Sequence, residues 1–271
     1  MDKFSVLISV YYKECPAYLD TALNSVFEQT VVPSEVVIVK DGKLTSGLDS
    51  VIDLYQEKYP EQIKIVSLPQ NVGLGQALNR GLEACTSELV ARMDSDDISL
   101  SGRFKKQLSV FKRFPKIDVV GGWISEFIDD PHNIVSVRKL PEHQEELLRY
   151  SKKRSPLNHV SVMFKKSAVL QAGSYQHFPL MEDYYLWVRM LMNGAQFYNI
   201  QESLVLVRNS NEMYNRRGGF RYARTESRFF KYLYKIHYIG LFLLITNVCI
   251  RFVVRIIPNR LRKQVYLKTL R

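Results

Sequence analysis

Apolar runs of strand length alternate with segments of helical spacing through the first third of the chain, and this alternation limits the fold most strongly. Helical spacing begins near Pro16, Leu48 and Gly75, and Pro60 ends the second helix. Nearly continuous apolar strands are typical of a parallel sheet that is buried on both faces. The sequence therefore predicts an α/β fold with a doubly wound, mostly parallel, Rossmann-like sheet. The predicted strands are Phe4 to Tyr11, Val36 to Val39, Ile63 to Val66 and Leu89 to Met93.

Polar or aromatic residues follow three of these strands directly. Ligands of doubly wound sheets bind at the carboxyl ends of the strands, so these residues are the first candidates for a functional site. The three segments are Tyr11-Tyr12-Lys13-Glu14, Lys40-Asp41-Gly42-Lys43 and Asp94-Ser95-Asp96-Asp97.

The third segment places three carboxylates within four residues. Such acids repel one another unless a cation holds them together, and hard oxygen ligands suit Mg²⁺ or Mn²⁺. As an alternative, Asp96 or Asp97 could cap a following helix. The position of the acids at a strand end, in a basic chain, favours the metal site.

The charge balance points to a polyanionic partner. The chain has 38 Lys and Arg against 27 Asp and Glu, a net charge of +11, which suits nucleotide phosphates, an anionic membrane or nucleic acid. Its three cysteines form no CxxC pair, so we expect neither a disulfide framework nor a cysteine zinc site. The reducing cytosol is the compartment that this cysteine usage favours. We expect no signal peptide, and no apolar run reaches the roughly 18 residues of a spanning helix.

Several motifs, in this order, resemble those of family 2 glycosyltransferases with the GT-A fold. The resemblance runs from residue 4 to about residue 210 and implies a catalytic domain over residues 1–212. It also implies transfer of a sugar from a nucleotide diphosphate sugar with inversion at the anomeric carbon. The motifs are Val6-Leu7-Ile8-Ser9-Val10-Tyr11, Gln29-Thr30, Asp41-Gly42, Asn71 to Gly81, Arg92 to Asp97, and Met181-Glu182-Asp183-Tyr184-Tyr185-Leu186-Trp187.

The resemblance assigns donor-side roles. Asp96 would bind the divalent ion directly, and Asp94 would lie near the ribose or the outer shell of the ion. Asp41 would accept a hydrogen bond from the base, which favours uracil, and Tyr11 would lie against that base. The family often has two acids where this chain has Lys40 and Asp41, so the local electrostatics differ.

Further donor-side candidates carry alternatives of their own. Lys13 and Arg92 could meet the donor phosphates, or they could be solvated surface residues. His159 resembles a donor-site histidine that would meet a phosphate or the ion; a histidine satisfied within the structure is the alternative. Val10, Asn71 and Ser95 complete the donor-binding set through their places in the motifs. For Asn71 the alternative is a turn, formed with Gly73, that lets the next helix start.

The acceptor hydroxyl needs a general base, and the resemblance assigns Asp183 to this role, with Glu182 orienting it or touching the acceptor. The alternative is structural, because two acids are favourable at a helix N-terminus and Leu186, Met190 and Leu191 would be core residues. Both interpretations can hold together.

The tail, residues 213–271, changes character. A basic and aromatic stretch, Tyr214 to Tyr222, precedes the apolar run Ile239 to Ile245, and arginines follow. This pattern is typical of helices that lie in a membrane interface. A helix pair packed on the catalytic domain and a short spanning helix are the alternatives.

Together with the tail, the resemblance implies a metal-dependent glycosyltransferase, peripheral on the cytoplasmic face of the inner membrane. It would move one hexose from a UDP-sugar, first of all UDP-galactose, to a polyprenyl diphosphate-linked saccharide in O-antigen or capsule assembly. A nucleotidyltransferase would carry a Gly-rich basic loop after the first strand, which Tyr11 to Cys15 is not. A nucleic-acid-binding protein is disfavoured because the basic residues gather toward the apolar tail.

Overall fold

The computed structural model describes residues 3–209 and 219–256 of the chain. Its N-terminal half alternates strands and helices as predicted, with bounds that differ by at most two residues; the second helix, for example, starts at Ser46 instead of Leu48. The elements are β1 (Phe4–Val10), α1 (Pro16–Phe27), β2 (Glu35–Lys40), α2 (Ser46–Lys58), β3 (Ile63–Ser67), α3 (Leu74–Ala84) and β4 (Leu89–Asp94).

The C-terminal half contains more and shorter elements. They are β5 (Ile98–Ser99), α4 (Arg103–Arg113), β6 (Val119–Phe127), β7 (Ile134–Arg138), α5 (Gln144–Ser151), the 3₁₀ turn η1 (His159–Ser161), β8 (Met163–Lys165), α6 (Lys166–Gln171), α7 (Glu182–Met192), β9 (Phe197–Arg208), α9 (Gly219–Lys235) and α10 (Leu241–Ile256).

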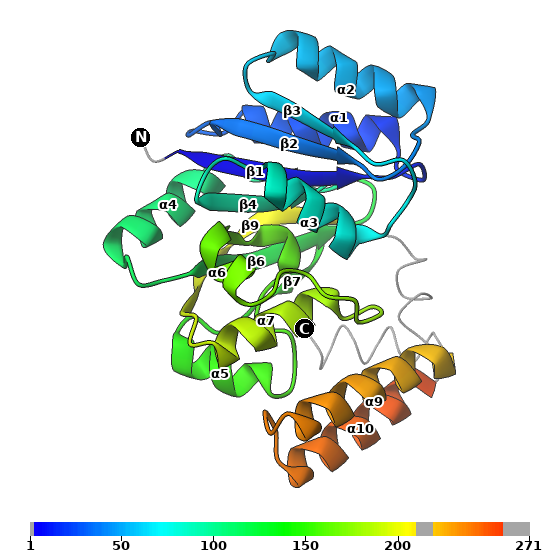
Figure 1. Cartoon of the computed structure of the whole chain (residues 1–271), viewed down its shortest axis with the longest axis vertical. Helices are drawn as coiled ribbons and strands as arrows, with labels where there is room; N and C mark the ends of the chain where they lie inside the picture. Colours follow the sequence, from blue (N-terminus) through cyan, green and yellow to red (C-terminus); the bar gives the residue numbers. More distant parts are fainter. Residues whose placement is uncertain (1–2, 210–218, 257–271) are drawn as a thin grey trace.

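The strands that the structure describes belong to one sheet of order β3-β2-β1-β4-β8-β6-β9-β5, with β7 paired to β6 (Figure 1). The pairs β1–β2, β1–β4 and β2–β3 are parallel, as the sequence predicts. The other half is mixed, because the short β8 runs antiparallel to both β4 and β6. The carboxyl ends of β1, β2 and β4 therefore lie side by side at one edge of the parallel half.

Apolar side chains on both faces of the sheet hold the helices in place. Along β1, Val6 and Ile8 join one core cluster, which includes Leu19 of α1 and Phe104 of α4. Leu7 points the other way, into a second cluster that α3, α6 and α7 complete. Burial on both faces explains why β1 is apolar at nearly every position instead of alternating.

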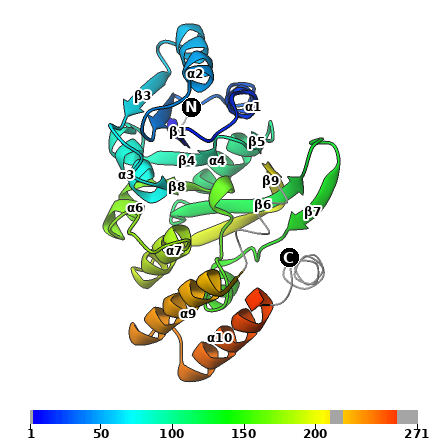
Figure 2. The ribbon, with the colours of Figure 1, turned by 90° about the vertical axis from the view of Figure 1, so that its right-hand side faces the viewer.

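The C-terminal helices α9 and α10 form a hairpin that lies against α5 and α7 (Figures 1 and 2). Tyr184 and Val188 of α7 share a third core cluster with Phe229, Phe230 and Leu233 of α9. The tail thus contains a helix pair packed on α7, and its association with a membrane stays a prediction. The predicted boundary at residues 212 and 213 lies outside the described residues. Among the helices that the structure describes, none combines the length and apolarity needed to cross a membrane.

Candidate active site

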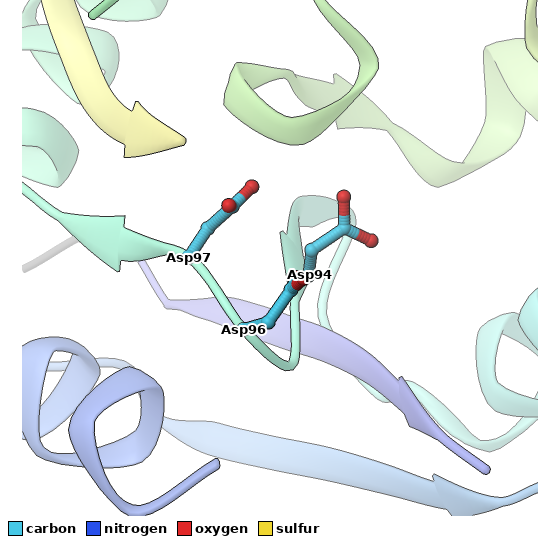
Figure 3. Close-up of side chains that lie close together, drawn as sticks. All are labelled: Asp94, Asp96 and Asp97. Atoms are coloured by element: carbon cyan, nitrogen blue, oxygen red, sulfur yellow. The ribbon is translucent and has the colours of Figure 1, made fainter. Parts of the chain in front are cut away.

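The three acids that follow β4 lie together on one turn. Ligand oxygens of Asp94, Asp96 and Asp97 are all within 4.8 Å of one another. Figure 3 shows the turn between β4 and β5, with Asp97 beside the end of β9. The backbone N–H of Arg208, the last residue of β9, donates to Asp97 Oδ1 over 2.9 Å. The cluster is thus positioned by two strands, β4 before it and β9 beside it.

The helix-cap alternative for these acids is wrong. Residues 98–99 form the strand β5, and the next helix, α4, starts at Arg103 with Gly102 as its N-cap. Neither Asp96 nor Asp97 occupies that cap position. Their proximity therefore needs another explanation than helix capping.

The electrostatics of the cluster suit a cation. Burial, and then the neighbouring Asp94, raise the pKa of Asp96 to about 6. The same causes, with Asp96 added, raise the pKa of Asp97 well above its ordinary value. Asp97 Oδ2 is buried and has no hydrogen-bond partner among the described residues. A divalent ion such as Mg²⁺ or Mn²⁺ would satisfy this oxygen and offset the repulsion, so the residues present fit such a metal.

Arg92 is not a surface residue. Its side chain is only 2% exposed and forms an ion pair with Asp94. Burial alone would lower the pKa of Arg92, but Asp94 raises it, so the guanidinium stays charged. The solvated-surface alternative is therefore wrong for Arg92, whereas Lys13 is exposed and lies 5.5 Å from the Tyr12 ring centroid.

Asp41, after β2, fastens the loop that precedes α3. Its carboxylate accepts from the Asn71 side chain (2.9 Å) and from the backbone N–H groups of Val72 (2.7 Å) and Gly73 (3.2 Å). Gly42 has φ +85°, and a Cβ there would lie 2.7 Å from the Asn71 nitrogen, so only glycine fits this turn. Asp41 and Asn71 thus lie together, as the predicted donor site requires.

The remaining donor-side candidates are also at this edge of the sheet. Val10 ends β1 and is fully buried, Tyr11 follows it half-buried, and Ser95 is buried between the acids. Lys40, where the family often has an acid, forms an ion pair with Asp49 in the first turn of α2. Its charge is therefore directed toward α2.

His159 lies in η1, where its Nε2 shares a 2.8 Å hydrogen bond with the Tyr175 hydroxyl. Burial, followed by the charge of Arg92, holds the pKa of His159 well below its ordinary value. The imidazole is therefore neutral and has a protein partner, which favours the structural alternative. A role toward a phosphate or an ion stays a prediction.

Glu182 and Asp183 occupy the first turn of α7, where no side chain caps the helix. Burial raises the pKa of both carboxyls. Behind them Leu186 and Met190 are fully buried, as the structural interpretation predicts. The helix start thus presents two acids whose ionised forms lose solvation, an environment that favours proton uptake.

Tyr175 connects the two ends of the site. Arg92, Asp183 and Asp94 all affect its pKa, which burial raises. The end of β4 and the start of α7 therefore lie in one electrostatic environment. No pattern in the sequence around Tyr175 marks it as functional.

Two arginines were also missed. Arg208 Nε donates to the Asp96 carbonyl over 3.3 Å, and its guanidinium lies 3.9 Å from the Tyr18 ring centroid. Arg103 is fully buried behind β4, where it donates to the Arg92 carbonyl over 2.6 Å. Burial, and then the charge of Arg92, lower the pKa of Arg103 to about 9. Only the mixed half of the sheet brings Arg208 to the acids, so sequence spacing could not reveal it.

Comparison with known proteins places this arrangement in a family. The model of Glycosyl transferase family 2 matches residues 5–177. A UDP-Gal:α-D-GlcNAc-diphosphoundecaprenol β-1,3-galactosyltransferase of Escherichia coli is 41% identical over 269 residues, which cover 99% of this chain and 97% of that protein. The amylovoran biosynthesis glycosyltransferase AmsE of Erwinia amylovora is 37% identical and covers 98% of both chains.

The fold has solved counterparts. The mannosyltransferase PcManGT from Pyrobaculum calidifontis, in complex with GDP-Man and Mn²⁺, superposes with a TM-score of 0.64 at 17% identity, over 92% of this chain and 69% of that one. At this identity the likeness concerns the fold, which is GT-A with added C-terminal helices. The family match over residues 5–177 and the full-length relatives lead to one conclusion: this chain is a glycosyltransferase that belongs to glycosyl transferase family 2.

Proposed function

We propose that this enzyme moves a single hexose from a UDP-sugar to a hydroxyl of a polyprenyl diphosphate-linked saccharide, with inversion. The observation that carries the proposal is the cluster of Asp94, Asp96 and Asp97 at the end of β4, whose ligand oxygens lie within 4.8 Å of one another. Besides burial, Asp183 and Asp94 both raise the pKa of Tyr175, which supports a position of Asp183 near this cluster. The full-length likeness to an enzyme named for a diphosphoundecaprenol acceptor supports the lipid-linked substrate. O-antigen or capsule assembly is the corresponding setting.

On the donor side, the edge formed by β1, β2 and β4 would receive the nucleotide. Tyr11 would lie against the base and Asp41 would hold the loop around it, while Val10, Asn71 and Ser95 line the same edge. Asp94 and Asp96, with Asp97 beside them, would hold Mg²⁺ or Mn²⁺, which would supply a positive charge that stabilises the departing UDP. Arg92 would keep Asp94 oriented through their ion pair. Lys13, exposed beside Tyr12, would approach the donor phosphates.

On the acceptor side, Asp183 would take the proton of the attacking hydroxyl. The oxygen attacks the anomeric carbon from the side opposite UDP, so an α-linked donor gives a β-linked product. Burial raises the pKa of Asp183, which makes its carboxylate a stronger base than an exposed aspartate. Glu182, one residue earlier, would contact the acceptor or orient Asp183.

The acceptor lipid would bring the enzyme to the cytoplasmic face of the inner membrane as a peripheral protein. An anionic membrane surface, and not nucleic acid, would then be the partner of the basic chain, whose net charge is +11.

Release of UDP tests the reaction. The purified chain is incubated with Mn²⁺, a diphosphate-linked saccharide and each nucleotide sugar of a panel: UDP-galactose first, then UDP-glucose and UDP-N-acetylglucosamine. Acceptor-dependent UDP release with a β-linked product, identified by proton NMR, is the expected result. Pyrophosphate release would identify a nucleotidyltransferase instead, and an α linkage would remove the assigned role of Asp183.

A further inference from the structure

All five Lys and Arg residues of α9 are exposed, and they recur at intervals of three and four residues: Arg221, Arg224, Arg228, Lys231 and Lys235. This spacing puts them on one side of the helix, which we call the α9 cation stripe. None forms an ion pair with another residue that the structure describes. Glu226, the acid of α9, is buried and pairs with Arg251.

The neighbouring helix α10 carries an exposed apolar stripe. Leu241, Phe242 and Ile245 are 55%, 77% and 53% exposed, and the exposed Cys249 continues the same side of the helix. We call these four residues the α10 apolar stripe. Single exposed apolar residues are ordinary, but four that share one side of a helix form a surface.

Both stripes lie on the outer surface of the hairpin. The opposite side of α9 packs Phe229, Phe230 and Leu233 into the core cluster shared with α7. The opposite side of α10 contributes Leu243 and Leu244 to the same cluster, and the hairpin forms the edge of the molecule beyond α7 (Figure 2). The cations and the exposed apolar side chains therefore face away from the catalytic domain.

We propose that the α9 cation stripe and the α10 apolar stripe together bind an anionic lipid bilayer surface. The five cations would contact lipid phosphates, while Phe242 and its neighbours would enter the boundary between headgroups and acyl chains. This surface deepens the proposed function, on which it rests, because it names how the enzyme reaches a lipid-linked acceptor.

Two rival partners fit the surface less well. Nucleic acid would engage the cations but gains nothing from an adjacent row of exposed Leu, Phe and Ile side chains. A second copy of the chain could cover the apolar stripe, but a twofold contact here would bring two sets of five cations close together. An anionic bilayer complements both stripes at once.

The packing of the hairpin gives the surface a catalytic consequence. Phe229 and Phe230 of α9 contact the cluster that contains Met181 and Tyr184, the residues that flank Glu182 and Asp183. A bilayer bound by the hairpin would therefore keep a constant relation to the start of α7. The acceptor lipid would enter from that side.

Vesicle flotation tests the surface with the full chain and without donor or acceptor. Vesicles of phosphatidylcholine with phosphatidylglycerol are compared with vesicles of phosphatidylcholine alone. Each basic residue near an anionic leaflet contributes about fivefold in partitioning, so Arg224→Glu/Arg228→Glu/Lys231→Glu should bind at least about 100-fold more weakly. The matched control Lys105→Glu/Lys112→Glu/Lys116→Glu changes three exposed lysines on and after α4 by the same charge and should bind like the wild type.

Phe242→Ser/Ile245→Ser tests the apolar stripe, and should lower binding to the anionic vesicles even in low salt. All of these variants change exposed side chains, so their thermal unfolding should match that of the wild type. Equal binding by the stripe variant and the α4 control would overturn the proposal. So would wild-type binding to duplex DNA without binding to vesicles, or a wild-type dimer that Phe242→Ser/Ile245→Ser makes monomeric.

The same variants separate this inference from the proposed reaction. With a water-soluble, short-chain diphosphate-linked acceptor, the stripe variant should release UDP at the wild-type rate. Vesicle binding by a wild-type protein that releases no UDP from any donor would refute the proposed reaction and leave the surface intact.

Discussion

Asp183→Asn is the sharpest test of the catalytic assignment. The amide keeps the size of the side chain and one acceptor oxygen, but it cannot take a proton. A positioned general base contributes about 10² to 10⁴ in rate, which corresponds to about 2.7 to 5.5 kcal/mol of transition-state stabilisation. We therefore expect kcat to fall by at least about 100-fold. UDP affinity should stay near that of the wild type, because the donor edge belongs to β1, β2 and β4.

The pH dependence gives the same variant a second readout. Burial raises the pKa of Asp183 above its ordinary value of 3.8, so the carboxyl takes up its proton earlier as the pH falls. The wild-type rate should therefore decline on the acid side at a pH above that of an exposed aspartate. The residual rate of Asp183→Asn should lack the part of this decline that comes from Asp183, whereas a decline from protonation of Asp96 should persist.

Stability should move in the opposite direction to activity. Because the pKa of Asp183 is raised in the folded state, ionisation of this carboxyl destabilises the fold. The destabilisation is complete above the folded-state pKa and absent below the unfolded-state pKa. At neutral pH, Asp183→Asn should therefore have a higher melting temperature than the wild type. The difference should vanish as the pH falls below about 4, the region of the unfolded pKa.

The assay is UDP release under saturating donor, together with thermal unfolding from pH 4 to pH 8. Asp53→Asn, on the exposed side of α2, is the matched control and should change neither quantity. A near-normal kcat for Asp183→Asn would refute the reasoning and point to Glu182 as the base. A lower melting temperature at neutral pH would instead mean that the ionised carboxylate stabilises the start of α7 more than its burial costs.

Three further changes test the rest of the site and the fold. Asp96→Ala should abolish turnover and metal-dependent UDP binding, as measured by calorimetry with Mn²⁺, and full wild-type activity in EDTA would contradict the metal site. Asp41→Ala leaves the N–H groups of Val72 and Gly73 without their acceptor, so we expect a loss of about 1 to 3 kcal/mol in unfolding free energy and weaker UDP binding. Gly81→Ala would put a Cβ 2.2 Å from Leu7 Cδ1, and overpacking of this kind costs about 1 to 3 kcal/mol of folding free energy. The melting temperature should therefore fall by a few degrees. An unchanged melting temperature would show that Leu7 can shift freely.

The parallel half of the sheet could be predicted because its signals are local. Each strand from β1 to β4 is an apolar run of strand length, and each intervening helix begins or ends at a Pro or Gly signal. The Asp94, Asp96 and Asp97 cluster was readable for the same reason, since its members are neighbours in sequence. Its position at a strand end then followed from the fold class.

The mixed half could not be predicted in the same way. The strands β5 and β8 have two and three residues, too few for any periodicity to appear. The antiparallel pairing of β5 with β9 brings the end of β9 to the acids, and it joins groups that are far apart in sequence. Arg208 donates to Asp97 across 111 positions of the chain. Burial raises the pKa of Tyr175, and the charge of Arg92, which precedes Tyr175 by 83 positions, lowers it.

The α9 cation stripe shows a different limit, because its spacing was present in the sequence. Arg221, Arg224 and Arg228 recur at helical intervals, but a basic helix by itself does not reveal which of its sides is covered. That depends on the opposite side, where Phe229 and Phe230 pack against α7. Because of this packing, the cations of α9 lie on the outer surface of the hairpin and do not pair with acids in the described part of the catalytic domain.

The helix α7 packs in two core clusters, so the proposed base on this helix is linked to the C-terminal hairpin. Leu186 and Trp187 lie in the cluster under the central sheet, whereas Tyr184 and Val188 lie in the cluster shared with α9 and α10. The N-terminus of the helix holds Asp183, so its position depends on both clusters at once. A change in the hairpin that loosens the second cluster would shift the proposed base without touching the donor edge, because β1, β2 and β4 contribute nothing to that cluster. Variants of the buried side of α9 should therefore alter acceptor turnover and spare UDP binding, whereas variants of its exposed side should alter neither in solution.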